Sequence, residues 1–211
     1  MEDTISGRKI IGIIDYGAGN ITSVMNALDY LSVDYQLIHS ESDMQKYSKV
    51  ILPGVGSFKH AMTKLAENKL DNAIRNFTET SSNKFLGICL GMQLLYDFSE
   101  EEGGCQGLGI IKGTVNRLVE SDGFKIPNIG WREIIIKSPS RLYKDITSEL
   151  IFYFVHSYAC QTVDEKIITG TSDHNGLFSC SIEYENIFAV QFHPEKSQRV
   201  GLSFLENFVK I

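Results

Sequence analysis

The stretch that decides the fold reads K-I-I-G-I-I-D at 9–15, Y-G-A-G-N at 16–20 and I-T-S-V-M-N-A-L-D-Y-L at 21–31. The first segment is a short apolar run, which is typical of a strand buried on both faces. The second is a glycine-containing turn, and in the third the apolar residues recur at helical spacing. The order strand, turn and helix is the repeating unit of a parallel sheet.

The same alternation of strands and helices continues along the first half of the chain. We expect strands at 35–38, 49–52 and 85–88, a helix at 58–77 capped by Ser57, and a helix that begins at Leu90. Apolar strands separated by helices indicate a parallel sheet that is covered by helices on both faces.

The pattern changes from Gly109 onward, where strand-like segments follow one another with only short turns between them. These segments lie at 110–118, 131–136, 151–158, 166–171, 177–184 and 187–192, before an amphipathic helix at 198–209. The sequence therefore predicts an α/β fold with antiparallel strands added late in the chain. No repeat or linker interrupts it, which favours a single domain.

The composition is that of an ordinary globular protein and excludes several classes of partner. Of 211 residues, 43% are hydrophobic and 22% are charged, and the net charge is −6 at pH 7. Because an acidic chain binds phosphate backbones and anionic lipids poorly, we expect no nucleic-acid and no membrane partner. The polar start at 1–9 is unlike a secretory signal, and the apolar runs are far shorter than the ~20 residues of a membrane-spanning helix. We therefore expect a cytoplasmic protein.

The four cysteines are widely separated, at 89, 105, 160 and 180. No two of them have C-x-x-C spacing and no histidines lie at zinc-ligand spacing, so we expect neither a disulfide framework nor a metal site. Free thiols suit a reducing compartment.

Cys89 stands in G-I-C-L-G at 87–91, the pattern of a nucleophile elbow with Cys in place of Ser. A strand precedes it and a helix follows it, as the motif requires. The start of the helix favours a thiolate, and the N–H of Leu90 can face a developing oxyanion. The alternative is a small buried cysteine that packs at a strand end.

A thiol nucleophile needs a base, and His193 is the best placed of the five histidines. It follows the strand expected at 187–192, and Pro194 ends that strand. In an extended segment residues two apart share a face, so Glu195 can accept the second ring N–H of His193. Cys89, His193 and Glu195 then form a triad of nucleophile, base and orienting carboxylate. The alternative is an exposed histidine beside a surface carboxylate.

The turn P-G-V-G at 53–56 directly follows the strand expected at 49–52. Gly54 and Gly56 permit unusual φ values, and the Val55 N–H is therefore a candidate second oxyanion donor. As a phosphate loop the turn is weak, because no G-K-[ST] follows. The alternative is an ordinary glycine-rich turn.

Six segments together resemble the class I glutamine amidotransferases, and among them the glutaminase subunits of imidazole glycerol phosphate synthases. They are D-Y-G-A-G-N at 15–20, L-P-G-V-G-S-F at 52–58, G-I-C-L-G-M-Q at 87–93, P-x-x-G-W at 127–131, V-H-S-Y at 155–158 and Q-F-H-P-E-K-S at 191–197. The resemblance covers the chain from about Lys9 to its end. It implies a single type-1 glutamine amidotransferase domain at 9–211, preceded by an N-terminal extension at 1–8.

The resemblance also implies a flavodoxin-like fold, a reaction and a partner. In such a protein Cys89 attacks the side-chain amide of L-glutamine, with His193 and Glu195 as its partners, and a thioester forms before glutamate is released. Leu90 and Val55 supply the oxyanion donors, and glutamine is held by Gly54, Gly56, Gln93, Ser157 and Tyr158. The ammonia passes through a channel to a (β/α)₈-barrel cyclase subunit of imidazole glycerol phosphate synthase in a heterodimer that serves histidine biosynthesis. No cofactor is implied.

The chain departs from the usual family pattern at two positions. At 127–132 it reads P-N-I-G-W-R, where the family usually has His in place of Asn128 and Asn in place of Arg132. Three alternatives therefore stay open. The first is a paralogous subunit that supplies ammonia for the amidation of bacterial surface sugars, the second is a free-standing Cys hydrolase, and the third is a binding module without activity.

Overall fold

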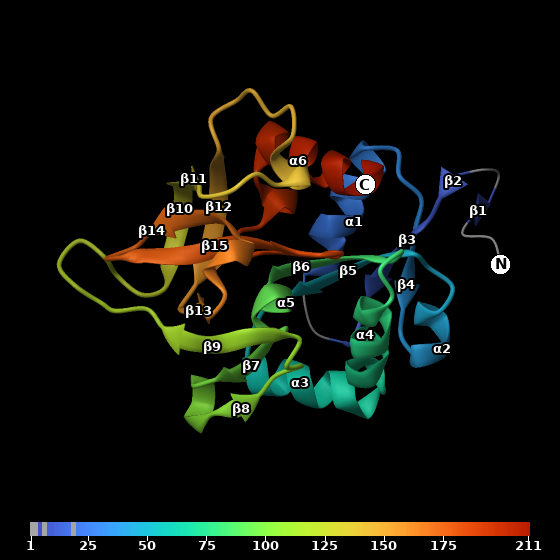
Figure 1. Cartoon of the computed structure of the whole chain (residues 1–211), viewed down its shortest axis with the longest axis horizontal. Helices are drawn as coiled ribbons and strands as arrows, with labels where there is room; N and C mark the ends of the chain where they lie inside the picture. Colours follow the sequence, from blue (N-terminus) through green and yellow to red (C-terminus); the bar gives the residue numbers. More distant parts are fainter. Residues whose placement is uncertain (1–3, 6–7, 18–19) are drawn as a thin grey trace.

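The computed structural model describes residues 4–5, 8–17 and 20–211, and a mixed twelve-stranded sheet lies at its centre (Figure 1). One half of the sheet is entirely parallel. Its strands are, in spatial order, β4 (Tyr35–Ile38), β3 (Ile11–Ile14), β5 (Lys49–Gly54), β6 (Lys84–Cys89) and β16 (Ile187–Val190).

The other half of the sheet is mainly antiparallel. It continues from β16 through β15 (Leu177–Tyr184), β13 (Tyr158–Thr162), β9 (Ile111–Arg117), β7 (Tyr96–Ser99) and β8 (Cys105–Gln106). Beside β15 lie β14 (Ile168–Asp173) and β11 (Ile135–Ile136). Two further pairs stand apart, β10 (Asn128–Glu133) with β12 (Ile151–His156) and β1 (Thr4–Ile5) with β2 (Arg8–Lys9).

Helices cover both faces of the parallel half (Figure 1). On one face α1 (Ile21–Tyr30) and α6 (Gln198–Lys210) pack against alternate residues of β3 and β5. On the other face lie α3 (Phe58–Glu67) and α4 (Leu70–Glu79), with α2 (Glu41–Met44) beside α4. Short helical turns complete the chain: α5 (Leu90–Gln93), η1 (Glu101–Gly103), η2 (Arg141–Tyr143), η3 (Glu165–Ile167) and η4 (Pro194–Lys196).

The expected α/β fold, with a parallel sheet between helices and antiparallel strands added late, is confirmed. Two helices differ from expectation. The helix expected at 58–77 is two helices, because Lys69 takes a left-handed conformation with φ 57° that ends α3 and starts α4. The helix expected from Leu90 is only the single turn α5, and the chain then enters β7, a strand that the sequence pattern did not predict.

The strands expected in the second half are largely present, with three changes. The segment 151–158 divides at Ser157 into β12 and β13, and 131–136 divides into β10 and β11. The segment 166–171 begins as the helical turn η3. Residues 1–3 and 6–7 of the expected N-terminal extension lie outside the described residues, and its boundary stays a prediction.

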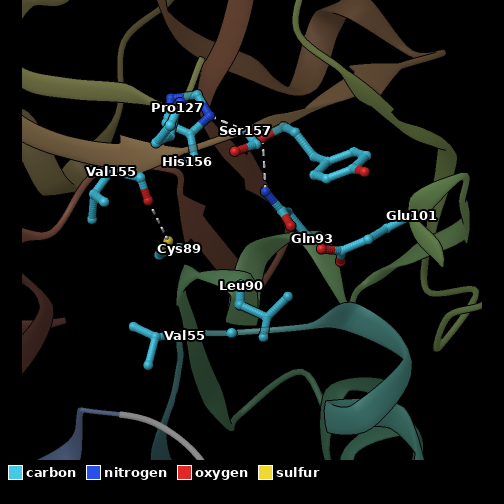
Figure 2. Close-up of a pocket in the computed structure, with 11 residues that line it drawn as sticks. Val55, Cys89, Leu90, Gln93, Glu101, Pro127, Val155, His156 and Ser157 are labelled. Carbon is cyan, nitrogen blue, oxygen red and sulfur yellow. Dashed lines mark hydrogen bonds between the residues drawn. The ribbon is translucent and has the colours of Figure 1, made fainter.

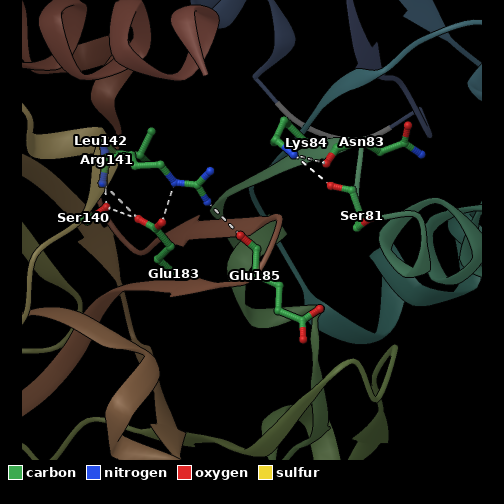
Figure 3. A network of polar contacts seen from close by, with 8 residues as sticks. All are labelled: Ser81, Asn83, Lys84, Ser140, Arg141, Leu142, Glu183 and Glu185. Carbon is green, nitrogen blue, oxygen red and sulfur yellow. Dashed lines mark hydrogen bonds and ion pairs between the residues drawn. The ribbon is translucent and has the colours of Figure 1, made fainter.

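A network of polar contacts fixes the loop before η2 onto β15 (Figure 3). The carboxylate of Glu183 accepts hydrogen bonds from Ser140 Oγ at 2.6 Å and from Arg141 N at 3.1 Å. Arg141 Nε lies 2.7 Å from the same carboxylate, and its guanidinium stands 4.7 Å from the centre of the Phe188 ring. Because three donors share one carboxylate, the loop is tied to the sheet more firmly than a single surface ion pair allows.

None of the helices in the described residues is long and apolar enough to cross a membrane.

Candidate active site

A pocket of about 320 Å³ lies where β5 and β6 end (Figure 2). Ligands of open α/β sheets bind at the carboxyl ends of the strands, so this is the expected place for a functional site. The pocket is lined by Val55, Gly56, Cys89, Leu90, Gln93, Glu101, Pro127, Val155, His156, Ser157 and Tyr158.

Cys89 sits on a sharp turn between β6 and α5 and is 5% exposed. Its backbone has φ 55° and ψ −109°, a strained conformation that costs a non-glycine residue about 1–3 kcal/mol. The turn is this tight because Gly91 has no side chain. A Cβ on Gly91 would lie 1.9 Å from the carbonyl oxygen of Leu52. The glycine therefore brings the start of α5 directly against β5.

The single turn of α5 changes the electrostatic argument for a thiolate. A helix of four residues adds little macrodipole, since that effect grows from aligned peptide units over several turns. α5 presents the N–H of Leu90 at the pocket. Because Leu90 is the first residue of this helix, no preceding helical turn supplies a carbonyl to accept that N–H. Charge stabilisation at Cys89 must come mainly from neighbouring side chains.

His193 and Glu195 are in direct contact. The distance from His193 Nδ1 to Glu195 Oε1 is 2.7 Å, and both side chains are 2% exposed. The contact does not arise in an extended segment, as the sequence argument assumed, but in the helical turn η4. The backbone of His193 is pinned to β12, because its N–H donates to the carbonyl of Tyr153 at 2.9 Å. Ser197 Oγ donates to the carbonyl of His193 at 2.6 Å.

The electrostatics of the pair favour a charged imidazole. Burial lowers the pKa of His193, but the charges of Cys89 and Glu195 outweigh it and hold that pKa well above its ordinary value. The second ring nitrogen, Nε2, makes no hydrogen bond of ordinary geometry within the described part of the chain. His193 is therefore the protonated partner of Glu195 at neutral pH.

The wall opposite Cys89 is built by β12, β13 and Gln93 (Figure 2). Gln93 Nε2 donates to the carbonyl of Tyr158 at 2.9 Å, and His156 Nδ1 lies 2.9 Å from the same oxygen. Burial lowers the pKa of His156 to about 4, so the ring is neutral and Nδ1–H donates. Its Nε2 then accepts from Asn128 Nδ2 at 3.0 Å, and Asn128 Oδ1 accepts from Arg132 Nε at 3.1 Å.

The glycine-rich turn approaches Cys89 from β5. Gly54 pairs with Cys89 in the sheet but does not line the pocket, and a Cβ there would lie 2.8 Å from Tyr16 Oη. Its glycine is required by close packing. Gly56 has φ +96° with open space around it, so its glycine is required by backbone conformation. Val55, between them, lines the pocket near Leu90 (Figure 2).

The structure therefore brings most of the predicted residues together. The residues around the pocket are Val55, Gly56, Cys89, Leu90, Gln93, Ser157 and Tyr158, whereas Gly54, His193 and Glu195 stand behind its wall.

Three residues with polar side chains at this site were not predicted from the sequence: Glu101, His156 and Gln191. His156 stands in the V-H-S-Y segment at 155–158 but was not singled out there. Glu101 lines the pocket from η1, and it lies in an acidic stretch at 100–102 that reads as an ordinary solvated surface. Gln191 is fully buried and contacts Cys89. The signal for Gln191 was its position two residues before His193, on the same side of a strand end.

Comparison with known proteins finds close relatives over nearly the whole chain. The family model "Glutamine amidotransferase class-I" matches residues 12–211. The chain is 44% identical over 202 residues to imidazole glycerol phosphate synthase subunit HisH of Chlorobaculum tepidum, covering 95% of this chain and 100% of the relative. It is 41% identical over 206 residues to the subunit of the same name from Pelagibacter ubique, covering 95% of this chain and 99% of the relative.

Solved structures of similar fold are more distant in sequence. A crystal structure of a glutamine amidotransferase matches with a TM-score of 0.74 at 16% identity, covering 95% of this chain and 99% of the other. The structure of PurLQS from Thermotoga maritima matches with a TM-score of 0.73 at 18% identity, covering 95% and 97%. At these identities the likeness concerns the fold alone.

Proposed function

This chain belongs to the class I glutamine amidotransferase family, and we propose that it is the glutaminase subunit of an imidazole glycerol phosphate synthase in histidine biosynthesis. It hydrolyses L-glutamine to glutamate and ammonia and delivers the ammonia to a cyclase subunit. The observation that carries the proposal is the buried ion-paired histidine at 2.7 Å from Glu195, beside a thiol that stands on a strained turn in the pocket.

The first chemical step follows from the charges of the site. The Cys89 thiolate attacks the side-chain amide carbon of glutamine, and the N–H groups of Leu90 and Val55 bind the developing oxyanion. Collapse of the tetrahedral intermediate breaks the C–N bond. The His193 imidazolium gives its proton to the leaving nitrogen, which departs as ammonia, and Glu195 keeps the ring oriented.

The second step returns the enzyme to its starting state. The thioester is attacked by water, and neutral His193 now accepts the proton of that water. Glutamate leaves and the Cys89 thiolate and the imidazolium are restored. One glutamine and one water give one glutamate and one ammonia, so no cofactor is needed.

The pocket also has groups for the amino-acid end of glutamine. Glu101 supplies a carboxylate at the pocket wall, which suits an α-ammonium group. Gln93, Ser157, Tyr158 and Gly56 line the remaining wall and hold the substrate with Glu101. Gly54 acts by packing, since it keeps the turn close to Leu90.

An apolar face next to the pocket suits a partner subunit. Ile129 and Trp131 point to the same side of β10 and are 55% and 43% exposed. Their cross-strand neighbours on β12 are Val155 and Tyr153, and Val155 also lines the pocket. A cyclase that covers this face would take up ammonia before it reaches bulk water. Exposed apolar residues of this size are typical of protein interfaces.

The test replaces the nucleophile in the complex with the cyclase from the same genome. Cys89→Ser should abolish synthesis driven by glutamine, whereas synthesis driven by ammonium salt should continue at the parent rate. Loss of both activities in an intact complex would contradict the division of labour. Parent protein that hydrolyses glutamine equally fast with and without the cyclase would favour a free-standing hydrolase. Glutaminase activity that no histidine-pathway cyclase stimulates would favour the surface-sugar partner.

A further inference from the structure

Gln191 is fully buried between β16 and His193, and its amide touches the sulfur of Cys89. The distance from Gln191 Nε2 to Cys89 Sγ is 3.7 Å, which is a normal length for a hydrogen bond to sulfur. Gln191 Oε1 lies 3.0 Å from Gln93 Nε2. The side chain therefore joins the reacting sulfur to a residue of the glutamine pocket.

The direction of both hydrogen bonds is fixed by a backbone carbonyl. The oxygen of Tyr158 can only accept, so the atom of Gln93 at 2.9 Å from it must be the amide nitrogen. The same nitrogen faces Gln191, which must present its oxygen there. The amide nitrogen of Gln191 then faces Cys89, and the N–H donates to the sulfur.

The strand end holds this amide and the histidine on one side. Gln191 and His193 are two residues apart and point toward Cys89, whereas Phe192 points the opposite way into an aromatic cluster. The ring centres of Phe192 and Phe152 are 4.1 Å apart. The backbone N–H of Gln191 donates to the carbonyl of Cys180 at 2.9 Å. Anchored in this way, the strand end keeps the Gln191 amide in reach of the sulfur.

The two protonation states of the sulfur have different partners. As a thiol, Cys89 can donate to the carbonyl of Val155, at 3.9 Å (Figure 2). As a thiolate it can only accept, and the N–H of Gln191 is a donor in place for that state. A donor to the charged form favours that form. The Gln191 amide therefore favours the nucleophilic thiolate, whereas the Val155 carbonyl favours the thiol.

We propose that Gln191 is a further catalytic residue, which donates a hydrogen bond to the Cys89 thiolate and links it through Gln93 to the bound substrate. The assignment of the reaction rests on the proposed function, but the hydrogen bond to sulfur does not. Since Gln93 and Gln191 each donate and accept, a ligand bond to Gln93 strengthens the next bond in the chain. The competing explanation is that Gln191 only satisfies polar groups in the interior.

The test measures how fast iodoacetamide alkylates Cys89 at different pH values, in the full chain without a partner. Mass spectrometry of the Cys89 peptide separates this thiol from Cys105, Cys160 and Cys180. Gln191→Met keeps the length of the side chain and removes the donor. We expect alkylation near pH 7 to fall about tenfold and the midpoint of the pH profile to rise by about one pH unit, the effect of one hydrogen bond to a charged group. Gln191→Asn, whose shorter amide cannot reach both neighbours, should move the profile in the same direction.

A matched control is Asn186→Leu. Asn186 is a buried amide at the other end of β16, and it donates to the carbonyls of Thr78 and Thr80. Its loss should lower the melting temperature and leave the alkylation profile of Cys89 unchanged. In the complex, Gln191→Met should lower kcat for glutamine about tenfold with a smaller change in KM.

The outcomes separate this inference from the proposed function. A folded Gln191→Met or Gln191→Asn variant whose profile superimposes on the parent would overturn the role of Gln191, whatever the glutaminase activity. If Gln191→Met shifts the alkylation profile but the parent protein never releases glutamate from glutamine, the role of Gln191 is supported and the proposed reaction is rejected. If Gln191→Met does not fold, the Gln191→Asn profile decides.

Discussion

Replacing Gly91 by alanine tests whether the packing of α5 on β5 sets the geometry of catalysis. The new Cβ would lie 1.9 Å from the carbonyl oxygen of Leu52, and real Cβ contacts essentially never fall below 3.0 Å. The start of α5 must therefore move away from β5 by about 1 Å. The Leu90 N–H and Cys89 move with it, because they are the two residues that immediately precede Gly91.

The expected loss of activity follows from that displacement. Misplacing reacting groups by about 1 Å costs on the order of 10² in rate. Overpacking costs about 1–3 kcal/mol of stability, which a domain stable by about 5–15 kcal/mol survives. We therefore expect Gly91→Ala to fold, to bind the cyclase and to lose glutaminase kcat by about 10²-fold.

The assay compares steady-state glutamate release in the complex with thermal melting of the subunit. Gly113→Ala is the control, because its Cβ would lie 2.1 Å from the carbonyl oxygen of Gln161 in the β9–β13 pair, and neither residue lines the pocket. It should destabilise the fold at least as much and keep the parent kcat within about twofold. Equal kcat values in the Gly91→Ala variant and the parent would refute the argument.

Two further predictions concern the histidines. Glu195→Gln removes a charge that raises the pKa of His193, so the imidazolium loses its proton at lower pH. We expect kcat to fall about 10²-fold, which is less than the loss caused by removing Cys89. The alkaline limb of the pH–rate profile should move to lower pH. An unchanged profile would remove Glu195 from the triad. The pKa of His156 is about 4 in the folded protein and 6.5 in the unfolded chain. Between these pH values the unfolded state binds one more proton than the folded state. The free energy of unfolding therefore falls by up to about 3 kcal/mol as the pH drops from 6.5 to 4. Denaturant melts of parent and His156→Gln across this range check it, since the variant should lack most of the slope.

The sequence pattern correctly predicts those strands whose bounds depend only on neighbouring residues. The strands at 35–38 and 177–184 have the expected bounds, because an apolar run between turn residues has few alternatives. The break at Lys69 had no such signal, since neither glycine nor proline marks it. The separate β10–β12 pair is set by long-range pairing, which periodicity does not encode.

The candidate site shows the same division. Cys89, His193 and Glu195 could be named from short motifs, because each motif carries its own local geometry. Glu101 and Gln191 could not, because their meaning depends on which distant residues face them. Gln191 becomes informative only when Gln93, 98 residues away in the sequence, is known to contact it.

The two positions at which the chain departs from the usual family pattern support each other. Asn128 donates to the neutral ring of His156 and then has an oxygen to satisfy, and Arg132 supplies the donor at 3.1 Å. His156 in turn donates to the Tyr158 carbonyl that also orients Gln93. Without Arg132 the buried Asn128 Oδ1 would lose this donor, so the two side chains form one connected unit. Because Trp131 adjoins Arg132 on β10, these two positions connect the face proposed for the partner to the pocket wall around Tyr158, and they leave Cys89, His193 and Glu195 untouched.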